Sequence, residues 1–343
     1  MSTSIKELIQ KASSLHGSDV HLKTNRPPFF RNRNGVLSPL GIEVISASHM
    51  EQYVMDCLQL SGHDELWGGD AQAFLADMRE TGDDADLAIT VDGQRIRCNI
   101  FYDLNGLSIA CRLLSNHIPT MEQIQLPYPL HEVIQKREGL VLFCGATGSG
   151  KTTALFALLN TINQQESKHI ITLEDPVEYQ LEAGKSIISQ REIGRDCDDF
   201  PSGLRSALRQ DPDVILVGEM RDADTIATAL RAAETGHLVF SSIHAATFAE
   251  AVDRIVQYFP ADEHPQRISE FANAMRAMTC CELLTRKDGQ GRVGAYALLL
   301  PTPATLSCIR DDNMKMVETF MSTGQGMQTM KQAKEALAFH GMI

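Results

Sequence analysis

The sequence predicts an α/β protein whose C-terminal part contains a mostly parallel β-sheet covered on both faces by helices. Two observations support this prediction. Strand and helix patterns alternate after residue 130, and a glycine-rich loop joins the first of these strands to a helix. Alternation is typical of parallel sheets, because parallel neighbours are usually joined by a crossover helix. The expected strands are apolar runs at residues 140–144, 169–173, 213–217 and 238–243.

The glycine-rich loop has the spacing of a phosphate-binding P-loop. It follows a short apolar strand and precedes an amphipathic helix expected from Lys151 to Asn163. Glycines let backbone N–H groups turn toward phosphate oxygens, the lysine adds positive charge, and the threonine hydroxyl can bind Mg²⁺. The alternative is a purely structural glycine turn. We therefore expect a nucleoside triphosphate to contact Gly145, Ala146, Thr147, Gly148, Ser149, Gly150, Lys151, Thr152 and Thr153, with Thr152 at the metal.

Composition narrows the class of protein. The chain has 343 residues, of which 43% are apolar, so it is globular and long enough for two domains. Neither a secretory signal nor a membrane-spanning apolar stretch is recognisable, and we expect a cytoplasmic protein. The net charge of −13 argues against nucleic acid as a partner. The eight cysteines are scattered along the chain, and we expect them to be reduced and mostly buried. Cys144 is expected to be the apolar end of a strand. Cys280 and Cys281 are adjacent, which suits neither a zinc site nor a disulfide.

A proline-rich stretch separates two regions. Three prolines between Ile118 and Leu130 predict a stiff connector, which divides the chain into an N-terminal domain (1–118), a linker (119–130) and a C-terminal domain (131–343). In the N-terminal domain we expect a helix at residues 4–15 and strands at 19–22, 86–91, 95–100 and 107–114, with Asp92 and Gly93 in a hairpin turn.

Two acidic residues follow buried strands and complete a phosphoryl-transfer site. Glu174 ends the strand at 169–173, and Glu219 comes after the strand at 213–217, in the layout of a Walker B element. A solvated loop is the alternative for a single acid of this kind, but two of them behind a P-loop favour a shared site. Two histidines flank the strand at 238–243. We expect His244 to reach the γ-phosphate or to couple it to a neighbouring subunit, whereas His237 either contacts nucleotide or only braces the strand.

These motifs resemble those of the secretion ATPases of type II secretion and type IV pili, most closely the PilT-like pilus retraction branch. The resemblance covers nearly the whole chain. It includes the P-loop, an Asp box at 171–179, a Walker B run at 211–222, a His box at 235–254, and short matches at 17–22, 291–296 and 326–329.

The resemblance implies a PAS-like N-terminal α+β domain, a RecA-like ATPase domain and a homohexameric ring that hydrolyses ATP with Mg²⁺ at the cytoplasmic face of the inner membrane. It implies that Glu174 activates or orients water and that Glu219 acts at Mg²⁺ through a water molecule. Arg95, Arg97 and Arg112 would reach the phosphates, with an ordinary solvated strand face as the alternative. The implied function is a type IV pilus motor that powers retraction, with an inner-membrane platform protein and a paralogous pilus ATPase as further partners.

The sequence departs from the retraction branch at one site. Leu306 stands where the first arginine of a conserved run is expected, while Arg310 is retained. This substitution puts the retraction-specific coupling in doubt without affecting the ATPase motifs. Four other functions remain as alternatives to a retraction motor. They are an ATPase of pilus assembly or of a related secretion system, a nucleic-acid translocase, a regulatory subunit of a paralogous motor, and, least favoured, a small-molecule kinase.

Overall fold

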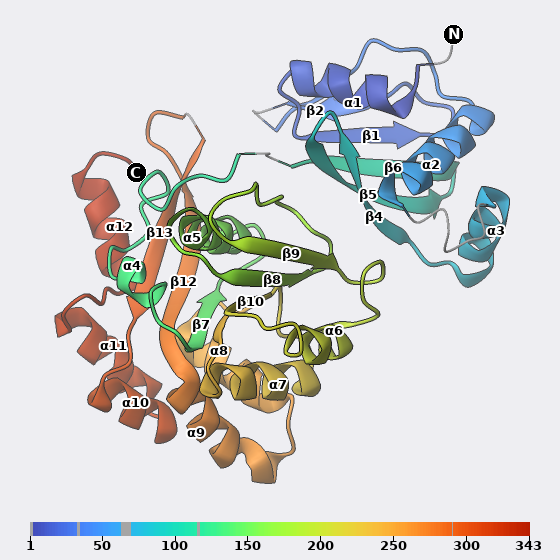
Figure 1. Cartoon of the computed structure of the whole chain (residues 1–343). Coiled ribbons are helices and arrows are strands. Elements are labelled where there is room, and N and C mark those ends of the chain that lie inside the picture. The colour runs from blue at the N-terminus through green and yellow to red at the C-terminus, as the bar shows by residue number, and fades with distance from the viewer. Residues whose placement is uncertain (1–2, 33–34, 63–69, 115–116, 290) are drawn as a thin grey trace. The chain divides into compact units, whose positions relative to one another are not determined.

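The computed structural model describes residues 3–32, 35–62, 70–114, 117–289 and 291–343 (Figure 1). The chain divides into two compact units. The N-terminal unit consists of Met1–His117 with the short segment Pro176–Gln180, and the C-terminal unit consists of Ile118–Asp175 and Leu181–Ile343. The sequence did not suggest that a segment of the Asp box belongs to the N-terminal unit. The domain boundaries at 118 and 130 stay a prediction.

The N-terminal unit is built on a six-stranded antiparallel sheet with the order β3-β2-β1-β6-β5-β4. Asp92 and Gly93 form the predicted hairpin turn, and both have the positive φ that such a turn requires. The first helix begins after Ser4, which forms a capping box with Glu7. The elements are α1 (Ile5–Ser14), β1 (Asp19–Lys23), β2 (Phe29–Arg31), β3 (Leu37–Pro39), α2 (Ala47–Ser61), α3 (Ala71–Thr81), β4 (Ala85–Val91), β5 (Gln94–Asp103) and β6 (Gly106–Leu113).

The C-terminal unit contains a seven-stranded sheet with the order β13-β12-β7-β11-β10-β8-β9. All neighbours are parallel except β12 and β13. The four strands predicted from apolar runs are confirmed as β7, β8, β10 and β11, and every residue of β7, β10 and β11 is buried. The strands are β7 (Gly139–Cys144), β8 (His169–Glu174), β9 (Ile187–Glu192), β10 (Val214–Val217), β11 (Leu238–Ile243), β12 (Met275–Thr285) and β13 (Arg292–Leu299).

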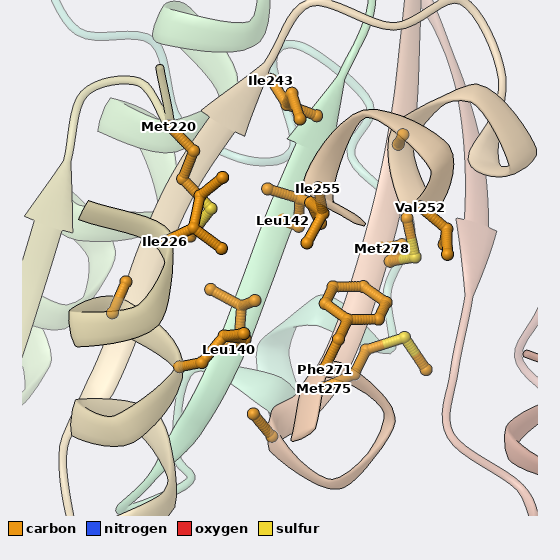
Figure 2. Packing of buried hydrophobic residues seen from close by; sticks show 14 of the residues in the cluster. Leu140, Leu142, Met220, Ile226, Ile243, Val252, Ile255, Phe271, Met275 and Met278 are labelled. Atoms are coloured by element: carbon orange, nitrogen blue, oxygen red, sulfur yellow. The ribbon is translucent and has the colours of Figure 1, made fainter. Parts of the chain in front are cut away.

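Helices bury the faces of this sheet. Figure 2 shows Leu140 and Leu142 of β7 packed beside Ile226, Ile255 and Phe271 from three helices. Replacing a leucine at such a position with alanine typically costs about 2–5 kcal/mol. The helices are α4 (Leu130–Val133), α5 (Lys151–Gln165), α6 (Phe200–Ala207), α7 (Ala223–Glu234), α8 (Phe248–Gln257), a 3-10 turn η2 (Ala261–Glu263), α9 (His264–Ala274), α10 (Pro303–Arg310), α11 (Met314–Thr323) and α12 (Met330–Phe339).

The parallel register determines where the functional loops emerge. Cys144 of β7 lies opposite Ile243 of β11, and Val217 of β10 lies opposite Leu173 of β8. The residues that follow these strands therefore leave the same edge of the sheet. Among the described residues, no helix is both long enough and apolar enough to cross a membrane.

Candidate functional site

The P-loop connects β7 to α5, as the sequence predicts. Gly145 has φ +152°, and a Cβ on it would lie 2.4 Å from Ser149 Oγ and 2.7 Å from the Cys281 carbonyl oxygen. Only glycine fits this position, because both the backbone angle and the close approach of β12 exclude a side chain. The loop ends at Gly150, immediately before α5, so the N-terminal amides of that helix are available to an anion.

Two polar side chains of the loop suit phosphate binding. The Ser149 hydroxyl is buried and has no hydrogen-bond partner among the described residues. Lys151 is only 8% exposed, and its Nζ donates to the carbonyl oxygens of Gly145 at 2.8 Å and Ala146 at 3.0 Å. An ammonium group, a hydroxyl donor and the amides at the N-terminus of α5 match the oxygens of a nucleotide phosphate. Thr152 and Thr153 follow in the first turn of α5, and Thr152 is half-buried.

Glu219 lies between a histidine and an arginine. Its Oε1 is 3.3 Å from His244 Nε2, and its Oε2 accepts a hydrogen bond from Arg221 Nε at 2.8 Å. The opposite nitrogen of the same ring, His244 Nδ1, is 3.4 Å from Lys151 Nζ. Arg221 also donates to Asp175 Oδ2 at 3.1 Å. A continuous polar network therefore runs from the P-loop lysine through His244, Glu219 and Arg221 to the end of β8.

The surroundings of His244 favour the neutral imidazole. Burial lowers its pKa below the ordinary 6.5, and the positive charge of Lys151 lowers it further, while Glu219 partly opposes both effects. A neutral ring can accept a hydrogen bond at one nitrogen and donate at the other. His244 can therefore accept from Lys151 while it donates to Glu219.

Glu174 ends β8 as a buried carboxylate. It is 4% exposed, and Oε1 accepts hydrogen bonds from Thr172 Oγ1 at 2.7 Å and from Gln190 Nε2 at 3.1 Å. Gly218 allows β10 to pass closely, since a Cβ there would lie 3.0 Å from the Leu173 carbonyl oxygen. The absence of a side chain at Gly218 therefore lets the two strand ends pack closely beside the acids.

His237 does not join this group. It precedes β11, at the end of the strand away from the P-loop, because Leu238 pairs with Gly139 and the strands run parallel. Its Nδ1 is 3.2 Å from the Ala232 carbonyl oxygen. The ring therefore lies at the turn between α7 and β11, and its contact with nucleotide stays a prediction.

The three arginines of the N-terminal unit that were predicted to reach the phosphates, Arg95, Arg97 and Arg112, have different environments. Arg95 is 7% exposed and donates through Nε to the Val177 carbonyl oxygen at 3.1 Å, so it holds the Pro176–Gln180 segment within this unit. Arg97 and Arg112 lie directly opposite each other on β5 and β6 and are paired with Asp86 at 3.3 Å and Asp19 at 3.0 Å. Their side chains are 40% and 69% exposed. Of these three arginines, Arg97 and Arg112 are therefore the two presented to solvent.

The expectation that all cysteines are reduced is wrong for one pair. Cys144, directly before the P-loop, forms a disulfide with Cys280 of β12. The two residues are register partners on neighbouring parallel strands, with 4.6 Å between their Cα atoms. Because 136 positions separate Cys144 from Cys280 in the sequence, their proximity could not be predicted from local patterns. Burial raises the pKa of the neighbouring Cys281 thiol to about 12, so that thiol stays protonated.

Sequence reasoning missed three participants: Thr172, Gln190 and Arg221. Thr172 has a local signal, because it lies two residues before Glu174 and therefore on the same face of the strand. Arg221 follows Glu219 by two residues, which places its guanidinium within reach of that carboxylate. No feature of the neighbouring sequence predicts that it also contacts Asp175 at the end of β8. No local signal identifies Gln190, because its position depends on the pairing of β9 with β8.

Comparisons with known proteins agree with this architecture. The family model described as "Type II/IV secretion system protein" matches residues 77–263. The type IV pilus retraction ATPase PilT of Pseudomonas aeruginosa is 35% identical over 342 residues, which cover 99% of this chain and 95% of that protein. A twitching motility protein of Neisseria gonorrhoeae is 41% identical over 251 residues, which cover 73% of this chain and 67% of that protein.

A solved structure has the same fold over the full length of the chain. The crystal structure of the pilus retraction motor PilT with bound ADP matches with a TM-score of 0.87 at 36% sequence identity. The match covers 100% of this chain and 95% of that one. That relative binds a nucleotide, the ligand class that the P-loop of this chain also indicates.

Proposed function

Because the chain belongs to the type II/IV secretion system protein family, we propose that it is an ATP-hydrolysing motor that powers retraction of a type IV pilus. The observation that carries the ATPase proposal is the network that joins Lys151 to His244, Glu219 and Arg221 beside the P-loop. The direction of the motor is supported by the likeness to the retraction ATPase and to the twitching motility protein.

The residues divide the chemistry of hydrolysis between them. Water attacks the γ-phosphorus, the bond to the β-phosphate oxygen breaks, and ADP and phosphate leave. Glu174 is the carboxylate that orients the attacking water and accepts its proton, since it is held rigidly at a strand end. The amides of the P-loop and Lys151 bind the phosphates and stabilise the charge that develops on the leaving oxygen.

Mg²⁺ fits the oxygen donors near the P-loop. When bound with ATP, the ion would neutralise phosphate charge and orient the phosphate oxygens. The Thr152 hydroxyl would be a direct ligand. Both oxygens of Glu219 already lie near His244 or Arg221, which favours contact with the ion through a water molecule. Glu219 is 16% exposed, so water can reach it.

The active form in this proposal is a homohexameric ring. Arg221 is engaged with Glu219 and Asp175, so it is poorly placed to move onto a γ-phosphate. Arg97 and Arg112, which share one exposed face of the N-terminal sheet, are the candidates to contact the nucleotide of an adjoining chain. Loss of the γ-phosphate would release this contact and convert hydrolysis into domain motion. The ring would act at the cytoplasmic face of the inner membrane on a pilus platform protein, with a paralogous pilus ATPase as a further partner.

ATP turnover by the purified full-length protein tests the proposed activity. Glu174→Gln should bind ATP with nearly unchanged affinity and lose turnover by about a hundredfold or more, because the proton acceptor is removed. Lys151→Ala should lose ATP binding itself. Undiminished turnover by Glu174→Gln would contradict the assignment of the base, and absence of turnover in the wild type would contradict the ATPase proposal.

Deletion of the gene followed by imaging of surface pili tests the direction. Excess pili that do not retract support the proposal, whereas bald cells support a role in assembly. Salt-sensitive binding of single-stranded DNA would instead favour a nucleic-acid translocase on the same core.

A further inference from the structure

Gln190 connects the end of β8 to the loop that follows the Asp box. Its Nε2 donates to Glu174 Oε1 at 3.1 Å, and its Oε1 accepts a hydrogen bond from the Leu181 backbone N–H at 2.8 Å. Both ends of the amide are therefore used. Reversing it would place an oxygen against the carboxylate and an NH₂ group against a backbone N–H, so the Leu181 N–H determines that a donor faces Glu174.

The backbone around this amide is itself fixed. Gln190 lies on β9, where it is the register partner of Thr172, the second donor to Glu174 Oε1. The loop that contains Leu181 is tied to α5, because Asn163 Nδ2 donates to the Glu182 carbonyl oxygen at 2.8 Å and the Lys185 N–H donates to the Asn163 carbonyl oxygen at 2.7 Å. Donors on two strands thus hold one carboxylate oxygen in a single orientation.

We infer that Gln190 is a positioning residue for ATP hydrolysis, which holds the Glu174 carboxylate in the orientation needed to activate water. The inference rests on the proposed function of Glu174. Gln190 acts through Glu174, because its Nε2 donates to the Glu174 carboxylate and its Oε1 is held by the Leu181 backbone N–H. It should therefore affect the rate of hydrolysis much more than the binding of ATP.

The charged surroundings of Glu174 make a second readout possible. Glu192 is its register partner on β9, Asp175 follows it in the chain, and Glu219 and Arg221 lie after the neighbouring strand β10. A further carboxylate at position 190 would add a like charge within hydrogen-bonding distance and disfavour ionisation of Glu174. The same charge placed far from the carboxylate whose ionisation limits the rate would not shift the pH dependence in this way.

Two substitutions separate the functions of the amide. Gln190→Leu removes both hydrogen bonds, and we expect kcat to fall by about ten- to a hundredfold while KM for ATP stays within about threefold. Gln190→Glu keeps an acceptor for the Leu181 N–H but replaces the donor with a negative charge. We expect the acidic limb of its pH–rate profile to move to higher pH by about one unit, so that part of the lost rate returns on raising the pH.

The matched control is Gln325→Glu, which introduces the same charge at an exposed turn of the C-terminal unit. It should leave kcat and the pH–rate profile unchanged. If Gln190→Leu reduces the amount of folded protein, measured by its thermal unfolding, Gln190→Glu still carries the test because it retains the bond to Leu181.

The outcomes distinguish this inference from the proposed function. In one outcome, Glu174→Gln loses turnover, but both Gln190 variants keep turnover within twofold of the wild type and show an unshifted pH profile. This outcome overturns the role of Gln190 and leaves the proposed function of Glu174 intact. An increase of KM that accounts for the whole loss in kcat/KM also overturns it. Full turnover by Glu174→Gln, or none by the wild type, overturns the proposed function and this inference with it.

Discussion

Arg221 Nε donates a hydrogen bond to Glu219 Oε2 at 2.8 Å, so a cation two residues further along the chain holds the acid that follows β10. The same guanidinium also reaches Asp175 after β8. One arginine therefore joins the acids that leave two neighbouring strands and offsets their mutual repulsion. The arrangement keeps Glu219 turned toward His244 and hence toward the P-loop.

Replacing Arg221 with alanine should weaken catalysis without unfolding the protein. Charge-assisted hydrogen bonds contribute about 1.5–3 kcal/mol, which corresponds to roughly a ten- to hundredfold loss in kcat/KM for MgATP. Steady-state ATPase assays at varied Mg²⁺ measure the effect. Arg286→Ala is the matched control, because Arg286 is paired with Asp288, also two residues away. Equal activities of the two variants would show that the bridge is dispensable.

The pKa of His244 should respond in opposite directions to its two charged neighbours. It should lie below 6.5 in the wild type, rise in Lys151→Met, and fall further in Glu219→Gln, because Lys151 lowers it and Glu219 raises it. NMR titration of the imidazole measures all three values. Lys334→Met, which removes a lysine paired with Glu282 instead, should leave the titration unchanged.

The sign of the pH effect on stability follows from the same shift. Because the pKa of His244 is lowered on folding, the folded state binds fewer protons than the unfolded chain as the pH falls below 6.5. The contribution of His244 to the free energy of unfolding is therefore fully present above pH 6.5. It is lost as the pH falls through the lowered pKa of the folded state. A titration at or above 6.5 in the wild type would contradict the described surroundings of the ring.

The number of reactive thiols should reveal the disulfide beside the P-loop. Protein purified without reductant and then denatured should expose six thiols of the eight cysteines, and all eight after reduction. Cys280→Ser should expose one thiol more than the wild type, because Cys144 is released. Cys308→Ser should expose one fewer, since Cys308 is already free. Full reactivity of the unreduced wild type would argue against the bond.

The N-terminal arginines should separate into one structural residue and two functional ones. Arg95→Ala leaves the Val177 carbonyl without its buried donor and should cost about 1–3 kcal/mol of stability. Arg97→Ala and Arg112→Ala should leave the thermal unfolding of the protein nearly unchanged. They should lower the ATP turnover of the proposed ring by about a thousandfold, as expected for arginines that act on a γ-phosphate.

An exposed arginine elsewhere in the same unit provides the control. Arg79 stacks on Tyr102, and Arg79→Ala should affect neither turnover nor the assembly of the ring. Normal turnover by both Arg97→Ala and Arg112→Ala would exclude these residues from the catalytic group. Stability equal to that of the wild type in Arg95→Ala would show that the buried hydrogen bond is not needed.

Local patterns predicted much of the fold because their signals lie close together in the chain. The buried runs of β7, β8, β10 and β11 and the Asp92–Gly93 hairpin needed no knowledge of distant residues. The strands β9, β12 and β13 were not predicted. Strand β9 is an edge strand with mostly half-buried residues, and β12 begins directly at the end of α9 without a glycine or proline to mark the change.

The sequence by itself determined where the glycine-rich loop and the acids lie along the strands and predicted their chemistry, because each depends on residue type and on spacing within a few positions. The tertiary structure alone decided which residues meet. It joined Glu174 to Gln190, paired Cys144 with Cys280, placed His237 away from the P-loop and buried Arg95 while leaving Arg97 and Arg112 exposed. These relationships depend on strand order and register, which are set by the packing of the whole sheet and by no single segment.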